Sequence, residues 1–283
     1  IANLSFLILV VLNTLKTTSM SKLKFAIIGN PIAHSLSPTL HNYWFKKYKI
    51  NAEYSLMQVT ENKIGDVIEK INKRELKGIN VTLPFKRSVI PYLSKTIKDA
   101  AETHSVNTVF LDDNNQLIGE NTDVFGFQAG YLKILTSQDK KNKKALIIGA
   151  GGVSPSIIVA LMKSNIKDIY LTNRTYEKSL FLKQKFSRLN ILKWNEFKEV
   201  LETVDIVINA TSLGLKKEDN FNIEFEKYNK NLVYIDTIYN PSQTNMIKKL
   251  KTKQITTHNG LNMFIYQGQK SFYLWNKINP EVD

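Results

Sequence analysis

The segment 80–86 carries polar side chains at positions from which they could act together on one ligand. In an extended strand alternate side chains face the same way, so Asn80 and Thr82 share one face while Leu83 belongs to the apolar, buried face. The following proline ends the strand and places Lys86 on the next turn, beside the polar face. An amide, a hydroxyl and an ammonium that converge at a strand end could bind and polarise a polar substrate. Taken alone, however, the segment is more typical of an edge strand followed by a solvated lysine.

Two further clusters supply hydroxyl, amide and carboxylate groups. Ser35 and Ser37 stand beside a predicted helix start marked by Pro38, where two hydroxyl donors could seat a carboxylate. Helix N-capping alone would explain Ser37 but not Ser35. The cluster 121–123 reads Asn-Thr-Asp and adds the carboxylate of Asp123.

A glycine-rich loop lies in the second half of the chain. Residues 149–154, Gly-Ala-Gly-Gly-Val-Ser, follow an apolar strand predicted at 145–148 and precede a predicted helix. In this context backbone N–H groups and a helix N-terminus bind the pyrophosphate of a dinucleotide. Ser154 stands at the third fingerprint position, where glycine or alanine is usual, and Pro155 follows it. A tight strand-to-helix turn is the alternative interpretation.

The next predicted strand ends at Asn173-Arg174-Thr175. An NAD-binding domain usually has an acidic residue at this point, which binds both ribose hydroxyls. Arginine instead pairs with a 2′-phosphate and stacks on adenine, and Thr175 and Lys178 could complete a phosphate site. The sequence therefore favours NADP over NAD, against the alternative of an ordinary surface arginine.

The predicted elements alternate between strands and helices, which is typical of an α/β fold with largely parallel pairing. In the first half, strands are predicted at 25–28, 53–59 and 78–83, helices at 37–48 and 62–71, and a hairpin from 106–111 and 117–118. A helix over 124–135 and a polar link over 136–144 lead to strands at 145–148, 168–172, 205–208, 232–236 and 254–256, and to a final helix over 263–278. We therefore expect two α/β domains, the first with a mixed sheet.

Composition excludes several classes of protein. The 283-residue chain has 43% hydrophobic and 23% charged residues, which is normal for a globular protein. It has no cysteine, so disulfides, thiolate zinc sites and cysteine nucleophiles are excluded. Its four histidines show no metal-ligand pair on one helix face, and we expect no metal. A net charge of +14 would suit an anionic partner, but the lysines are scattered, which favours a solvated surface over nucleic-acid binding.

Residues 1–19 form an anomalous segment. Their apolar stretch is shorter than the roughly 20 residues that span a bilayer. It also lacks the basic and small-residue flanks of a secretory signal. The sequence from Met20 is typical of an ordinary start. We therefore expect residues 1–19 to be a non-domain extension that is dispensable for activity, either an upstream translation artefact or a disordered or helical appendage; a membrane anchor is the less favoured alternative.

Taken together, these motifs resemble the shikimate dehydrogenase family in their order and spacing. The resemblance runs from about Lys24 to Trp275, and no single motif carries it. Besides the clusters above, it includes the segments 209–212 (Asn-Ala-Thr-Ser) and 260–263 (Gly-Leu-Asn-Met), with Gln267 following the latter. The chain departs from the family just before Val106, where Gly-Ala is usual and His104-Ser105 stands here.

The resemblance implies a role for each cluster. Lys86 and Asp123 match the catalytic pair, in which the ammonium polarises the reacting carbonyl and donates a proton while the carboxylate holds the lysine in place. The substrate carboxylate would be held by Ser35, Ser37 and Tyr239, and the ring hydroxyls by Asn80, Thr82, Asn107 and Gln267. NADP(H) would be bound by Gly149, Ala150, Gly151, Gly152, Val153, Asn173, Arg174, Thr175, Lys178, Thr237 and Gly260.

The implied architecture has a substrate-binding domain of residues 20–122 and 260–283, to which the C-terminal helix returns, and a Rossmann-type NADP-binding domain of residues 123–259. The implied activity is reversible NADPH-dependent reduction of 3-dehydroshikimate to shikimate in aromatic amino acid (chorismate) biosynthesis. We expect a cytoplasmic enzyme, monomer or homodimer, that acts on a small molecule. The alternatives are a quinate/shikimate dehydrogenase of relaxed specificity, a catalytically silent NADP-binding regulator and, disfavoured by charge, a nucleic-acid-binding protein.

Overall fold

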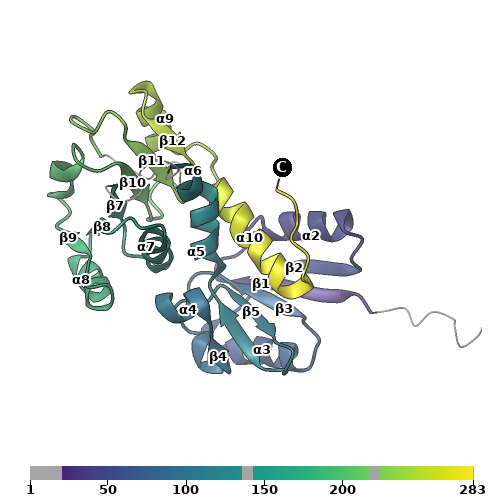
Figure 1. Cartoon of the computed structure of the whole chain (residues 1–283). Helices are drawn as coiled ribbons and strands as arrows, with labels where there is room; N and C mark the ends of the chain where they lie inside the picture. Colours follow the sequence, from purple (N-terminus) through teal and green to yellow (C-terminus); the bar gives the residue numbers. More distant parts are fainter. Residues whose placement is uncertain (1–20, 136–142, 217–218, 220–222, 283) are drawn as a thin grey trace, which may run out of the picture.

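Two α/β units lie side by side, and two helices run between them (Figure 1). The computed structural model describes residues 21–135, 143–216, 219 and 223–282. The predicted extension 1–19 and most of the predicted link 136–144 lie outside the described residues. Within the described part of the chain each unit contains a six-stranded sheet. No helix in that part is long and apolar enough to cross a membrane.

The first sheet is mixed, as predicted. Its order is β2-β1-β3-β5-β6-β4; β1 lies parallel to β2 and β3, whereas β5 runs antiparallel to β3 and β6. The strands are β1 (Leu23–Gly29), β2 (Ala52–Gln58), β3 (Gly78–Val81), β4 (Lys95–Thr96), β5 (Thr108–Leu111) and β6 (Leu117–Glu120). The β5–β6 pair is the predicted hairpin, whose turn is closed by backbone and side-chain hydrogen bonds to Asp112.

Helices cover both faces of this sheet, because its strand β1 is apolar on both sides. Ala26 and Ile28 pack in one cluster with the apolar face of α3 (Ile64–Asn72), which follows the 3₁₀ turn η1 (Glu61–Lys63). Phe25 and Ile27 belong to an aromatic cluster with α2 (Ser37–Lys47) and α10 (Leu261–Asn276). An apolar run of this kind is typical of a strand buried on both faces. The carboxyl end of β1 is thereby fixed.

The second sheet is entirely parallel and has the order β12-β11-β10-β7-β8-β9, the doubly wound order of dinucleotide-binding domains. Its strands are β7 (Lys144–Ile148), β8 (Asp168–Thr172), β9 (Asn190–Leu192), β10 (Ile206–Asn209), β11 (Val233–Asp236) and β12 (Thr256–His258). Its helices are α7 (Ser154–Lys163), α8 (Tyr176–Lys185) and α9 (Asn245–Thr252), with the 3₁₀ turn η4 (Phe197–Val200). The strand order reverses between β7 and β10, where such folds bind their ligand.

The connection between the sheets is helical. The elements α5 (Thr122–Phe127), η3 (Gln128–Leu132, a π-helical turn) and α6 (Lys133–Leu135) follow one another, so the helix predicted over 124–135 starts two residues earlier and contains a π turn. This helix lies against α10 in close contact. A Cβ on Gly126 would lie 2.7 Å from the Met263 carbonyl oxygen, so only glycine permits this approach. Helix α10 then returns to the first sheet, as predicted.

Several local predictions are wrong. The strand predicted over 78–83 ends at Val81, and Leu83 is 60% exposed rather than buried. The predicted N-cap is also wrong, because Leu36 is the N-cap of α2 and Ser37 is its first helical residue. Several short elements are missing from the prediction, among them β4, α4 (Lys98–Thr103), β9 and the 3₁₀ turn η2 (Ile90–Tyr92). They have too few residues to show a hydrophobic period.

The dipeptide His104-Ser105 stands where Gly-Ala is usual in the family, and its backbone has a conformation that glycine favours. His104 follows α4 in the left-handed conformation, with φ of 46°. Glycine adopts this conformation without a Cβ penalty, whereas other residues pay roughly 1–2 kcal/mol. Two residues later, the Val106 N–H donates to the Lys86 carbonyl oxygen at 2.8 Å. The segment before Asn107 therefore supports the turn that carries Lys86.

Gly78→Ala should destabilise the fold, because a Cβ at this position would lie 2.3 Å from Trp275 Nε1 and 2.9 Å from the Val109 carbonyl oxygen. The Trp275 indole donates to that carbonyl at 3.3 Å and thereby docks α10 on the sheet. We expect a loss of about 1–3 kcal/mol or more in the free energy of unfolding, measured by urea denaturation. Gly151→Ala is the control, since its nearest neighbour would be 3.7 Å away. Equal stability of the two variants would contradict this account of the docking.

Candidate active site between the two sheets

Lys86 and Asp123 form an ion pair at the junction of the two units. Lys86 Nζ donates to Asp123 Oδ2 at 2.5 Å, and the two side chains are 13% and 9% exposed. Asp123 stands in the first turn of α5, whose N-cap Asn121 accepts a hydrogen bond from the Asp123 N–H. A pair this sheltered needs further hydrogen bonds to offset the loss of hydration. The structure thus brings together the two residues predicted to be catalytic.

Asn107 supplies one of those hydrogen bonds. Its Nδ2 donates to Asp123 Oδ1 at 2.9 Å, while its Oδ1 accepts from the Thr122 N–H at 2.8 Å. These two bonds fix which end of the amide faces Asp123. Asn107 is only 3% exposed. One Nδ2 proton has no protein acceptor within the described residues, so this predicted substrate residue can still donate to a ligand.

Asn80 lies behind the site. Its Oδ1 accepts from the Tyr54 hydroxyl at 2.7 Å, and its Nδ2 donates to the Asn107 carbonyl oxygen at 2.9 Å. Further contacts at 3.1 Å join Nδ2 to the hydroxyls of Thr108 and Ser271. Asn80 is 4% exposed and its amide protons are used within the protein. Both ends of the Asn80 amide are therefore held by the protein, and its contact with the substrate stays a prediction.

Thr82 and Gln267 keep polar capacity for a ligand. The backbone N–H of Thr82 donates to the Ile28 carbonyl oxygen at 2.9 Å, and its half-buried side-chain hydroxyl has no protein partner within the described residues. Gln267 lies on α10, and its Nε2 donates to the Phe264 carbonyl oxygen at 2.8 Å. This bond holds the amide and leaves its oxygen available. Both residues fit the predicted substrate contacts.

Ser35, Ser37 and Tyr239 form a cluster of hydroxyls, as predicted. Ser35 Oγ donates to Ser37 Oγ at 3.2 Å. Tyr239 follows β11 in the second unit and stacks on Phe264 with ring centroids 4.6 Å apart, and the Leu36 backbone lies close enough to its hydroxyl to act on its pKa. Burial raises the pKa of Tyr239, so its hydroxyl remains a neutral donor at physiological pH. The cluster therefore combines groups from both units and can hold a carboxylate.

The glycine loop lies at the carboxyl end of β7, where the strand order reverses. Gly149 has φ of +113°, and a Cβ there would lie 2.7 Å from Thr211 Cγ2. The Ala150 N–H donates to Asn173 Oδ1 at 3.1 Å, which ties the loop to the end of β8. Ser154, the departure from the usual fingerprint, donates its hydroxyl to the Gly149 carbonyl oxygen at 2.8 Å. Gly151, Gly152 and Val153 complete the turn into α7.

Arg174, Thr175 and Lys178 lie together at the start of α8, and all three are exposed. Asn173 Nδ2 donates to the Thr175 carbonyl oxygen at 2.7 Å, which shapes the loop that carries Arg174. Within the described residues neither Arg174 nor Lys178 has an ion-pair partner. Two unpaired cations beside the glycine loop can bind a 2′-phosphate.

Thr237 and Gly260 meet at the carboxyl ends of β11 and β12. A Cβ on Gly260 would lie 2.2 Å from the Thr237 carbonyl oxygen, so the two backbones approach as only glycine permits. The Thr237 hydroxyl donates to the Asn209 carbonyl oxygen at 2.9 Å. Both predicted cofactor residues thus lie at the same sheet edge as the glycine loop.

The two units also touch through apolar contact. The exposed side chain of Leu83 reaches the glycine loop, and a Cβ on Gly152 would lie 3.0 Å from its Cδ2. Sequence reasoning missed this contact, because strand alternation predicts a buried Leu83. The turn that carries Lys86 therefore rests against the loop predicted to bind pyrophosphate.

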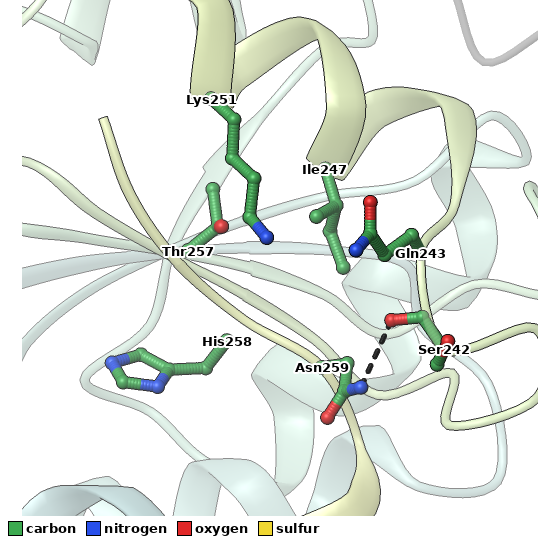
Figure 2. A pocket seen from close by; sticks show the side chains of 7 residues that line it. All are labelled: Ser242, Gln243, Ile247, Lys251, Thr257, His258 and Asn259. Carbon is green, nitrogen blue, oxygen red and sulfur yellow. Dashed lines mark hydrogen bonds between the residues drawn. The ribbon is translucent and has the colours of Figure 1, made fainter. Parts of the chain in front are cut away.

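A polar surface pocket lies elsewhere, between α9 and the end of β12 (Figure 2). It is lined by Ser242, Gln243, Ile247, Lys251, Thr257, His258 and Asn259. None of the predicted site residues lines it. Among the described residues, no group of three or more His, Asp or Glu side chains could hold a metal ion.

Comparison with known proteins defines the family. Residues 27–109 match the model of the shikimate dehydrogenase substrate binding domain, and residues 132–260 match that of shikimate / quinate 5-dehydrogenase. The chain is 50% identical over 262 residues to the NADP(+) shikimate dehydrogenase of Pelagibacter ubique, with 93% of this chain and 96% of the relative covered. The relative from Aquifex aeolicus is 37% identical over 254 residues, with 89% of this chain and 90% of the relative covered.

Solved structures agree with this comparison. The crystal structure of shikimate dehydrogenase from Aquifex aeolicus superposes with a TM-score of 0.85 at 35% identity and covers 94% of this chain and 96% of its own. That of the Thermus thermophilus enzyme in complex with NADP(H) and shikimate has a TM-score of 0.81 at 27% identity, with coverage of 92% and 95%. The fold and site define a two-domain NADP-type dehydrogenase. The chain belongs to the shikimate dehydrogenase family.

Arg174→Asp should change cofactor preference, because a carboxylate repels a 2′-phosphate and accepts ribose hydroxyls. Loss of a charge-assisted contact of about 1.5–3 kcal/mol should raise the KM for NADP⁺ roughly 10- to 150-fold, with little change for NAD⁺. Arg188→Asp, which makes the same charge change at an exposed position after α8, is the control. An equal rise for both cofactors, or a wild type that uses them equally well, would refute the role of Arg174.

Proposed function

We propose that this protein catalyses the reversible NADPH-dependent reduction of 3-dehydroshikimate to shikimate in aromatic amino acid biosynthesis. The observation that carries the proposal is the Lys86–Asp123 ion pair, with its 2.5 Å contact. It stands between a cluster of neutral hydroxyl and amide donors and the glycine loop of a Rossmann-type sheet. Membership of the shikimate dehydrogenase family supports it.

Substrate binding follows from the hydrogen-bonding groups of the site. The hydroxyls of Ser35, Ser37 and Tyr239 would hold the substrate carboxylate, since each can donate one proton. Thr82, Asn107 and Gln267 would hold the ring hydroxyls. A site built from neutral donors rejects analogues that lack the matching hydroxyls, because its buried polar groups would be left unpaired. The substrate is thereby oriented with its ketone toward Lys86.

The chemical step needs one proton donor. NADPH, when bound, would supply the hydride. Lys86 would donate a proton from Nζ to the carbonyl oxygen as negative charge develops there. Asp123 keeps the ammonium in place through its Oδ2, and Asn107 restrains the other carboxylate oxygen. In the oxidative direction, the neutral Lys86 amine would take the proton back.

Cofactor binding would use the carboxyl ends of the second sheet. The loop of Gly149–Val153 would hold the pyrophosphate through its N–H groups, and Arg174, Thr175 and Lys178 the 2′-phosphate. Asn173 shapes the loop through its bonds to Ala150 and Thr175. Thr237 and Gly260 would face the nicotinamide end. We also propose a cytoplasmic enzyme, monomer or homodimer, without nucleic-acid or membrane partners.

Lys86→Met should lower kcat with shikimate about 10²–10⁴-fold, because it removes the proton donor, while the KM for NADP⁺ stays nearly constant. The kcat of the Lys86→Met/Asp123→Asn double variant should be little lower than that of Lys86→Met, since the two residues act as one unit. Lys63→Met is the control, because Lys63 pairs with Asp66 on the exposed surface. The measurement is NADP⁺ reduction under saturating substrate. A kcat of the Lys86→Met enzyme within a few-fold of the wild-type value would contradict the assignment of Lys86 as the proton donor.

Parallel assays with quinate test substrate specificity. A wild-type enzyme that turns over neither shikimate nor quinate would leave only the interpretation as an NADP-binding regulator.

Ser35→Ala tests whether Ser35 binds the substrate carboxylate. Loss of one hydroxyl contact to an anion costs about 1.5–3 kcal/mol, so the KM for shikimate should rise roughly 10- to 150-fold. Ser55→Ala, an exposed serine on β2, serves as the control. An unchanged KM for shikimate would count against carboxylate binding by Ser35.

A further inference from the structure

Ser271 lies at the centre of a buried polar network that no step of the mechanism above uses. It stands on α10, is fully buried, and its hydroxyl has partners in three other elements and on its own helix. Its oxygen accepts from Asn80 Nδ2 at 3.1 Å, and its one proton can go to Thr108 Oγ1 at 2.8 Å, to Thr122 Oγ1 at 3.1 Å or to the Gln267 carbonyl oxygen at 3.1 Å. One hydroxyl thus joins α10 to β3, β5 and α5.

The network runs from Ser271 to the catalytic pair. The hydroxyls of Thr108 and Thr122 each donate to Asn107 Oδ1 at 3.1 Å. The other end of the same amide donates to Asp123, which holds Lys86. Because an amide has distinct donor and acceptor ends, bonds to its oxygen keep its nitrogen aimed at Asp123. Ser271 therefore restrains Asp123 through the residues that hold Asn107.

The network runs in the other direction to the carboxylate seat. The Tyr54 hydroxyl donates to Asn80 Oδ1 at 2.7 Å, and on its other side the Ser37 side chain lies close enough to act against the effect of burial on the Tyr54 pKa. Tyr54 is 3% exposed, and its ring is stacked on that of His41 with centroids 4.5 Å apart. The side chain of Asn42 holds the Tyr54 backbone through two bonds of 2.9 Å. Ring and backbone are thereby fixed.

We propose that Tyr54 and Ser271 are positioning residues, which align the carboxylate seat at Ser37 and the Lys86–Asp123 pair through one buried hydrogen-bond network. The network explains why Asn80 is polar although it is buried. Its members are satisfied by one another, so removal of one hydroxyl leaves a buried partner unpaired. This inference rests on the proposed function, since it concerns the geometry of that site.

The experiment compares Tyr54→Phe and Ser271→Ala with matched controls. Tyr54→Phe should mainly raise the KM for shikimate, and Ser271→Ala should mainly lower kcat, each about 2- to 13-fold for one neutral hydrogen bond. The KM for NADP⁺ should not change. Tyr170→Phe and Ser179→Ala are the controls. Tyr170 is partly buried on β8 and Ser179 is fully buried on α8, and neither hydroxyl has a hydrogen-bond partner within the described residues.

A double variant separates positioning from general loss of structure. In a Lys86→Met background, Ser271→Ala should lower kcat no further, because its effect passes through Lys86. If the same loss persists in that background, or if both variants match their controls, the inference is overturned. A wild type that is inactive with shikimate would instead overturn the proposed function itself. Thermal unfolding of each variant accompanies the kinetics, and a kinetic loss that follows only the melting temperature also overturns the inference.

Discussion

The ion pair between Lys86 and Asp123 is the interaction on which the rest of the site depends. Both charges are largely removed from water, so their attraction must be supplemented by bonds to the remaining carboxylate oxygen. Asn107 provides that bond, and its own amide is fixed by Thr122. The two partners come from the turn after β3 and the start of α5. The first sheet and the connecting helix must therefore keep a constant relation.

Helix α10 contributes to that relation. Helix α10 docks on the first sheet through Trp275 and lies along α5 at Gly126. At both contacts a glycine leaves no room for a side chain, so α10 packs directly against the backbone of its neighbour. The same helix carries Gln267 into the site and Ser271 behind it. Packing and chemistry are thus combined in one element.

The second unit supplies the cofactor side by a different physical principle. In a parallel sheet the carboxyl ends of the strands meet at one edge, and folds of this class bind their ligand where the strand order reverses, which is here between β7 and β10. The positive φ of Gly149 and the close approach of Gly260 to Thr237 are backbone features. The glycines in the sequence therefore indicated these backbone features. Leu83 extends from the first unit to the same loop, although strand alternation predicts that it is buried.

Two α/β units, the glycine loop and the arginine after the second strand could be predicted from residue type and short spacing, which fix backbone conformation and side-chain direction within one element. Lys86 and Asp123 were predicted to pair only through the resemblance to a family, because they are 37 residues apart. The contacts among Asn80, Tyr54 and Ser271 could not be predicted, because they depend on tertiary packing. Asn80 and Ser271 are 191 residues apart in the chain, and no local pattern encodes which distant polar groups will meet in a dry interior. Their pairing is decided when the helices and sheets pack, because each buried donor must then find an acceptor within the protein.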